Sequence, residues 1–193
     1  KIALLAEVDR LTPSRAVIAT NTSALSITEL ASSSRSPGRV AGMHFFNPVH
    51  KMKLVEVVLA LESTPETLDT IEWVARAMGK ETVLVKESPG FITTRVNASI
   101  GNEAFYMLQE GVASARDIDK ALKLGLNHPM GPFEMVDLVG LDVRLSILEF
   151  LHRTLGDTYR PNQILVQHVR AGRLGRKVGR GVYTYNENGE RVK

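Results

Sequence analysis

Apolar residues in the first half of the chain alternate between helical and strand-like spacing. Residues 2–11 carry apolar side chains at helical spacing that stop before Pro13, and a second helical pattern runs from Thr64 to Gly79. Short runs rich in β-branched residues lie around these helices, at residues 15–20, 39–46, 53–60 and 81–88. Strands that alternate with helices predict a sheet layered with helices over this half of the chain.

The first predicted strand leads into the polar segment NTSALSITELA, which reads as a turn followed by a short helix. Helix N-caps are commonly Ser, Thr, Asp or Asn, because their side-chain oxygens accept hydrogen bonds from free backbone N–H groups. Asn21, Thr22 or Ser23 is therefore the predicted cap of this helix.

After Pro89 the apolar spacing is helical, and no strand pattern occurs between Pro89 and Gly172. The helical patterns cover residues 95–111, 114–125 and 133–156. The sequence therefore predicts an α/β domain over residues 1–88 and an all-helical domain over residues 89–193.

The composition excludes several classes of function. The 193 residues contain no cysteine, so disulfides, thiolate metal sites and cysteine nucleophiles are ruled out. The formal net charge is only +3, and no basic tract is interleaved with aromatic residues, which argues against a nucleic-acid partner. No apolar run is long enough to cross a bilayer, and the first residues lack the pattern of a signal peptide. We therefore expect a soluble cytoplasmic protein with an anionic small molecule as its partner.

The stretch GMHFFNPVHKMKLVEV contains the strongest candidate for chemistry. His44 stands near the end of a predicted strand, where ligands bind in open α/β sheets, and Glu56 interrupts the next apolar strand. A histidine whose second ring nitrogen is bonded to a carboxylate is a suitable general base near neutral pH. The alternatives are a histidine satisfied within the core and a glutamate that alternates outward to water. A metal site with His50 is disfavoured, because no carboxylate stands at a familiar ligand offset.

Six motifs occur in order along the chain: NTSAL, GMHFFNPV, MKLVEVV, SPGFITTR, LKLGLNHPMGPFEMVDLVGLD and GRLGRKVGRGVYTY. In this order and spacing they resemble the 3-hydroxyacyl-CoA dehydrogenase family, and within it the bacterial short-chain 3-hydroxybutyryl-CoA dehydrogenases. The resemblance implies a Rossmann-type NAD-binding domain followed by a helical domain that supplies most of a homodimer interface. It also implies reversible, NAD-dependent oxidation of the 3-hydroxyl of an acyl-CoA, as in fatty-acid β-oxidation.

Carried over residue by residue, the resemblance makes His44 the base that takes the hydroxyl proton and Glu56 the carboxylate that orients it. Ser23 matches a hydroxyl that contacts the reacting oxygens of the substrate. Thr94 stands where the family commonly has Asn, so we expect it to keep a weaker substrate-side role, because a hydroxyl has fewer donors and less reach than an amide.

The same resemblance implies a set of residues on the nicotinamide side of the site. Asn21 and Asn47 match residues that line the nicotinamide together with His44, and Lys1 matches a family lysine nearby. Lys177 resembles a family lysine near the cofactor. Taken alone, the basic residues around it would indicate only a solvent-exposed end of the chain.

The family's glycine-rich turn G-x-G-x-x-G, which holds the pyrophosphate of the cofactor, does not occur in this sequence. We therefore expect the sequence to be the later part of a longer enzyme, with only the C-terminal portion of the NAD-binding domain. The alternative is a truncated, non-catalytic dimerisation or binding module of the same family.

Overall fold

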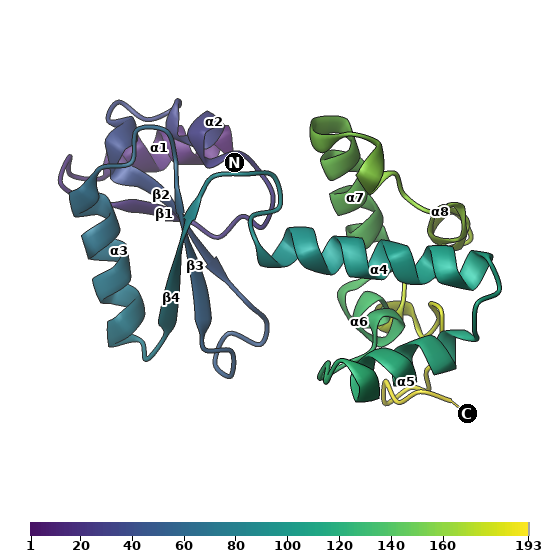
Figure 1. Cartoon of the computed structure of the whole chain (residues 1–193). Coiled ribbons are helices and arrows are strands. Elements are labelled where there is room, and N and C mark those ends of the chain that lie inside the picture. Colours follow the sequence, from purple (N-terminus) through teal and green to yellow (C-terminus); the bar gives the residue numbers. More distant parts are fainter. Residues whose placement is uncertain (193) are drawn as a thin grey trace. The chain divides into compact units, whose positions relative to one another are not determined.

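The computed structural model describes residues 1–192 and divides into two compact units, the first ending at Thr94 and the second starting at Arg95 (Figure 1). The first unit contains a sheet with helices, and the second contains helices followed by an irregular C-terminal segment. No helix within residues 1–192 is long and apolar enough to cross a membrane.

The first unit confirms the predicted alternation of strands and helices. Its elements are α1 (Ile2–Leu11), β1 (Ile18–Thr20), α2 (Ile27–Ala31), η1 (Pro37–Arg39), β2 (Val40–Phe45), β3 (Leu54–Leu59), α3 (Pro65–Ala77) and β4 (Glu81–Lys86). The four strands form one sheet in the order β1-β2-β3-β4. β1 runs parallel to β2 and β3 runs parallel to β4, whereas β2 and β3 are antiparallel.

Each face of this sheet packs against different helices, as the alternation of side chains along a strand requires. One face packs against α3 through a cluster that includes Ala41, Met43, Val55, Val57, Ile71 and Ala75. The other face packs against α1, α2 and the segment before α4 through Val40, Val58, Val85, Leu5, Ile27, Leu30 and Phe91. His44 and Glu56 continue the alternation of Val40 and Val58, so they lie on this second face.

The predicted cap of α2 is wrong. Ser26 is the N-cap, and its side-chain oxygen accepts a hydrogen bond from the backbone N–H of Glu29 at 3.0 Å. The Thr22 hydroxyl instead accepts from the N–H of Leu25 at 3.1 Å, which closes a separate turn between β1 and the helix. Because residues 22–25 form this turn, α2 starts only at Ile27, and Ser23 has no capping role.

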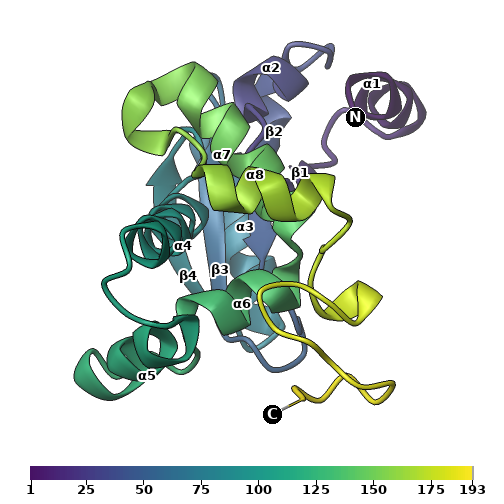
Figure 2. The same cartoon turned by 90° about the vertical axis from the view of Figure 1, so that its right-hand side faces the viewer.

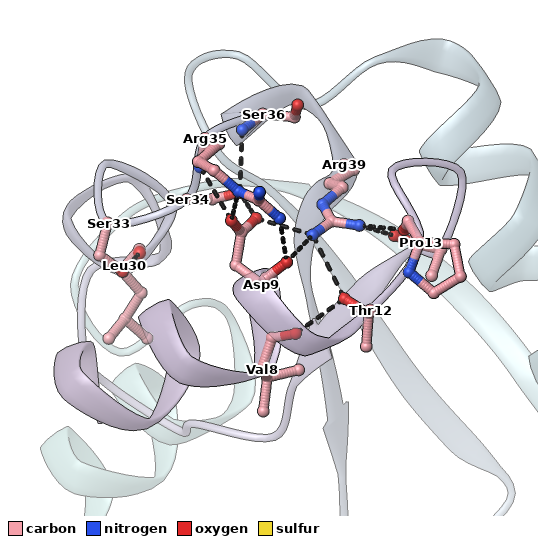
Figure 3. A network of polar contacts seen from close by, with 11 residues as sticks. Val8, Asp9, Thr12, Pro13, Leu30, Ser33, Ser34, Arg35, Ser36 and Arg39 are labelled. Carbon is pink, nitrogen blue, oxygen red and sulfur yellow. Dashed lines mark hydrogen bonds and ion pairs between the residues drawn. The ribbon is translucent and has the colours of Figure 1, made fainter.

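A network of polar contacts ties α1 to the loop before β2 (Figure 3). The buried carboxylate of Asp9 accepts bonds from Arg39 Nη2 at 2.7 Å, from Arg35 Nε at 2.8 Å and from the Ser34 hydroxyl. Arg39 also donates to the carbonyl oxygens of Pro13 and Ala16. The hydrogen bond from Ser34, with those from Arg39 and Arg35, holds the pKa of Asp9 well below its usual range.

The second unit is built from α4 (Thr93–Gln109), α5 (Ala115–Gly125), α6 (Pro132–Val139), α7 (Leu141–Leu155), η2 (Asp157–Tyr159), α8 (Gln163–Arg170) and η3 (Arg176–Val178). The first residues of α4 belong to the first unit. α7 packs against α8 (Figure 2), and Phe105, Phe133 and Leu148 are among the fully buried residues of the core. The helical run predicted over residues 133–156 is two helices, because Gly140 with φ of 108° ends α6 and precedes α7.

The prediction of an all-helical second domain is wrong for its last residues. Apart from the short η3, residues 172–192 form turns joined by isolated β-bridges. Asp137 at the buried end of α6 holds this segment, since it accepts bonds from the N–H groups of Val182 and Tyr183 and from the Tyr185 hydroxyl. Repeated glycines with positive φ, at 172, 175, 179 and 189, prevent a continuous helix there.

Candidate functional site

The register of two antiparallel strands brings His44 and Glu56 together. The two residues are directly opposite partners in the β2–β3 ladder, so their side chains point to the same face of the sheet. His44 Nδ1 lies 2.7 Å from Glu56 Oε2, and the two side chains are 5% and 0% exposed. The two side chains that the sequence predicts as a dyad therefore lie within hydrogen-bond distance, and their catalytic role stays a prediction.

The Glu56 carboxylate is stabilised by donors from the segment that starts α4. Its Oε1 accepts bonds from the backbone N–H groups of Thr93 at 3.0 Å and Ile92 at 3.3 Å, and the Thr93 hydroxyl lies 3.2 Å from Oε2. Burial is the largest influence on the pKa of Glu56 and raises it, but the bonds from His44 and Thr93 together outweigh burial and lower the pKa. Glu56 is therefore ionised at neutral pH.

An ionised Glu56 fixes the tautomer of His44. A carboxylate only accepts hydrogen bonds, so the neutral imidazole carries its proton on Nδ1 and presents the lone pair of Nε2. Nε2 has no hydrogen-bond partner within residues 1–192. Aromatic rings restrain the imidazole, with centroid distances of 4.7 Å to Phe46 and 5.7 Å to Phe91. This arrangement suits a base that removes a proton from a bound molecule.

Two predicted cofactor-side residues follow the carboxyl ends of parallel strands. Asn21 follows β1, and its side-chain oxygen accepts a bond from the backbone N–H of Phe45 at 2.8 Å. Asn47 is exposed and lies two residues after the end of β2. Because β1 and β2 are parallel, both asparagines lie at the same edge of the sheet as His44.

The remaining predicted site residues are spread over both units. Ser23 and Thr94 are half-buried, and neither side chain has a hydrogen bond within the described part of the chain. Lys1 is exposed at the start of α1. Lys177 belongs to the second unit, where its Nζ donates to both carboxylate oxygens of Asp142 at 2.6 and 2.7 Å.

Two residues near the start of α4, Thr93 and Phe91, contact the dyad side chains and were not predicted from the sequence. Phe91 is buried against His44 with φ of 50°, a backbone conformation that is uncommon for bulky residues. The usable signal was the carboxylate of Glu56 within an apolar strand, because a buried carboxylate needs donors and the free N–H groups at a helix N-terminus bind anions. Within residues 1–192, no group of three or more His, Asp or Glu side chains is arranged to hold a metal ion.

Comparison with known proteins places both units in one family. Residues 1–88 match the 3-hydroxyacyl-CoA dehydrogenase NAD binding domain, and residues 90–185 match the 3-hydroxyacyl-CoA dehydrogenase C-terminal domain. The chain belongs to the 3-hydroxyacyl-CoA dehydrogenase family. The first unit is thus part of a Rossmann-like NAD-binding domain, and NAD is the cofactor that this family domain implies.

Several members of the 3-hydroxyacyl-CoA dehydrogenase family match over nearly the whole chain. A probable 3-hydroxybutyryl-CoA dehydrogenase from Bacillus subtilis is 48% identical over 188 residues, covering 97% of this chain and 66% of the relative. A 3-hydroxybutyryl-CoA dehydrogenase from Clostridioides difficile is 48% identical, with 93% and 64% covered. The crystal structure of (S)-3-hydroxybutyryl-CoA dehydrogenase from Ralstonia eutropha has a TM-score of 0.93 at 43% identity, with 96% and 66% covered. The chain therefore spans slightly less than two thirds of the length of these relatives.

Proposed function

We propose that the protein oxidises the 3-hydroxyl group of a short-chain 3-hydroxyacyl-CoA to the ketone with NAD, and catalyses the reverse reduction. The observation that carries this proposal is the buried pair of His44 and Glu56 with a free Nε2. The names of relatives at 48% identity, which are 3-hydroxybutyryl-CoA dehydrogenases, support the substrate class.

In the oxidation, His44 Nε2 accepts the proton of the 3-hydroxyl group. The electron pair of the breaking O–H bond forms the carbonyl, and the C3–H bond supplies the hydride. Bound NAD would supply the hydride acceptor. Glu56 holds Nδ1–H at 2.7 Å, which keeps the ring in place and stabilises the imidazolium that forms. In the reduction, the imidazolium returns its proton to the oxygen.

The residues at the carboxyl edge of β1 and β2 fit the nicotinamide end of the cofactor. Asn21 and Asn47 place amide groups at the edge where α/β sheets bind ligands, and both lie at the same edge as His44. Lys177 and Lys1 are proposed as further cofactor-side cations. The glycine-rich pyrophosphate turn is not among the 193 residues, so these residues would hold only part of the cofactor.

Two hydroxyl residues are proposed for the substrate side. Ser23 follows β1, two residues beyond Asn21, and its hydroxyl is free of protein hydrogen bonds within residues 1–192. The Thr94 hydroxyl is likewise free in the described structure. Free hydroxyl groups suit contact with the 3-oxygen and thioester oxygen of the substrate.

We further propose that the complete protein is a cytoplasmic homodimer that acts in fatty-acid β-oxidation and associates through its helical unit. Several large apolar side chains of that unit are exposed, which supports a subunit contact there. They include Val112, Leu124 and Leu126.

The reaction can be tested on the full-length gene product with 3-hydroxybutyryl-CoA and NAD. We expect NADH absorbance to rise and acetoacetyl-CoA to form in equal amounts, as measured by mass spectrometry. Free 3-hydroxybutyrate, which lacks the CoA moiety, is the matched control and should react far more slowly. Absence of NAD reduction with 3-hydroxyacyl-CoA substrates of every chain length would overturn the proposal.

A further inference from the structure

One residue, Thr93, contacts both oxygens of the Glu56 carboxylate. The backbone N–H of Thr93 donates to Glu56 Oε1 at 3.0 Å, while the hydroxyl of the same residue lies 3.2 Å from Oε2. Oε2 is also the oxygen that binds His44 Nδ1 at 2.7 Å. Thr93 therefore shares its acceptor with the proposed catalytic base.

We propose that Thr93 is a positioning residue of the dyad, whose hydroxyl fixes the rotation of the Glu56 carboxylate and limits how strongly that carboxylate stabilises protonated His44. This inference rests on the proposed role of His44 as base. Nothing in the sequence motifs had pointed to Thr93, since the resemblance directed attention to Thr94.

The rotation of the carboxylate depends on donors at both oxygens. Two backbone N–H groups, from Ile92 and Thr93, hold Oε1 and do not involve any side chain. Within residues 1–192, Oε2 is held only by His44 and the Thr93 hydroxyl, so removal of the hydroxyl leaves the imidazole as its single donor there. A carboxylate held less firmly lets the imidazole move from its productive orientation, which lowers the rate.

The same shared oxygen sets the strength of the base. A second donor on Oε2 draws off part of its negative charge, so the carboxylate stabilises the imidazolium less than it would alone. His44 is the one titratable group that bonds to Glu56 within residues 1–192, and no lysine, arginine or second carboxylate pairs with either residue there. The aromatic rings beside His44, those of Phe46 and Phe91, are uncharged.

The test compares Thr93→Val with Thr93→Ser in the full-length gene product. Valine keeps the shape and the backbone N–H but lacks the hydroxyl, whereas serine keeps the hydroxyl. For Thr93→Val we expect kcat to fall about 3- to 10-fold. This is less than the loss expected when a general base itself is removed, because His44 and Glu56 both remain. We also expect the acid limb of kcat/KM for oxidation to move up by roughly 0.5 pH unit, because protonated His44 is better stabilised. Thr93→Ser should restore both values.

Thr70→Val is the matched control, because Thr70 is exposed on α3 and its hydroxyl bonds only to the Glu66 carbonyl. If Thr93→Val leaves both kcat and the acid limb unchanged, the inference is wrong. A large loss of kcat in Glu56→Gln would then show that the proposed function still stands. If Glu56→Gln also keeps the native kcat, the proposed function itself is wrong. If Thr93→Val does not fold, an NMR titration of the His44 ring compares the native protein with Thr93→Ser. The inference requires the same titration midpoint in both proteins, with Nδ1 protonated in the neutral ring. A different midpoint would overturn it.

Discussion

At the scale of single residues, the His44–Glu56 pair depends on how a buried carboxylate keeps its charge. Glu56 is fully buried, and a charge in that position is tolerated only when donors replace water. His44, Ile92 and Thr93 supply those donors, and the bonded carboxylate in turn fixes which nitrogen of His44 is free. The free lone pair of Nε2 therefore follows from the donors that hold Glu56.

Glu56→Gln tests this dependence. An amide is neutral, so it cannot stabilise the imidazolium, and its NH2 group cannot accept the Nδ1 proton. We expect kcat to fall about 100-fold or more while KM changes little, because the loss is confined to the proton-transfer step. Steady-state kinetics on the full-length gene product measure both. Glu62→Gln, at an exposed position, is the control and should behave like the native protein.

At the scale of elements, the β2–β3 register creates the dyad, and one glycine permits the strands to approach. Gly42 pairs with Val58 in this ladder, on the same face as the dyad. A Cβ at residue 42 would lie 2.8 Å from the Val58 Cβ and 3.3 Å from Ile27 Cδ1, both closer than ordinary contact. The close packing of α2 on the sheet therefore requires a glycine two residues before His44.

Gly42→Ala is expected to lower the free energy of unfolding by about 1–3 kcal/mol, the usual cost of overpacking a core. Urea denaturation followed by circular dichroism measures the change. Gly125→Ala is the control, because a Cβ there meets nothing within 4 Å. Equal stability of the two variants would show that β2, β3 and α2 can separate without cost.

The network that anchors α1 gives the first unit a pH-dependent stability. The folded-state pKa of Asp9 is depressed by Ser34, Arg39 and Arg35, so its contribution is present above the unfolded value and is lost as pH falls below about 4. Asp9→Asn should therefore have a lower Tm than the native protein at pH 7, with a difference that shrinks between about pH 4 and pH 2. Asp69→Asn, at an exposed site on α3, should show neither effect. A constant Tm difference for Asp9→Asn across this range would contradict the linkage.

At the scale of the whole molecule, the sequence predicted most elements but not their ends. Helical and strand periodicities located α1, α3 and the four strands, because burial on one side of an element leaves a repeating pattern. The break at Gly140 and the irregular C-terminal segment depended on positive φ values and on bonds to buried Asp137, which no local pattern reveals. The dyad was found through residue types and family resemblance, whereas Thr93 required the long-range contact between β3 and the start of α4.

Cofactor affinity is a property of the whole molecule as well. A protein consisting of residues 1–193 lacks the glycine-rich turn whose N–H groups hold a pyrophosphate. We expect such a protein to dimerise in size-exclusion chromatography with light scattering, yet to bind NADH at least 10-fold more weakly than the full-length gene product, as followed by NADH fluorescence. Equal NADH affinity of the two would mean that the turn is dispensable.

The most direct test of the account is the acetoacetyl-CoA-dependent oxidation of NADH by the full-length gene product and by its His44→Ala variant. The account predicts rapid turnover by the native protein and a loss of about 100-fold or more in kcat for the variant, with the circular dichroism spectrum unchanged. A folded His44→Ala variant that turns over at the native rate would contradict it, because the proton of the reaction would then be carried by another group.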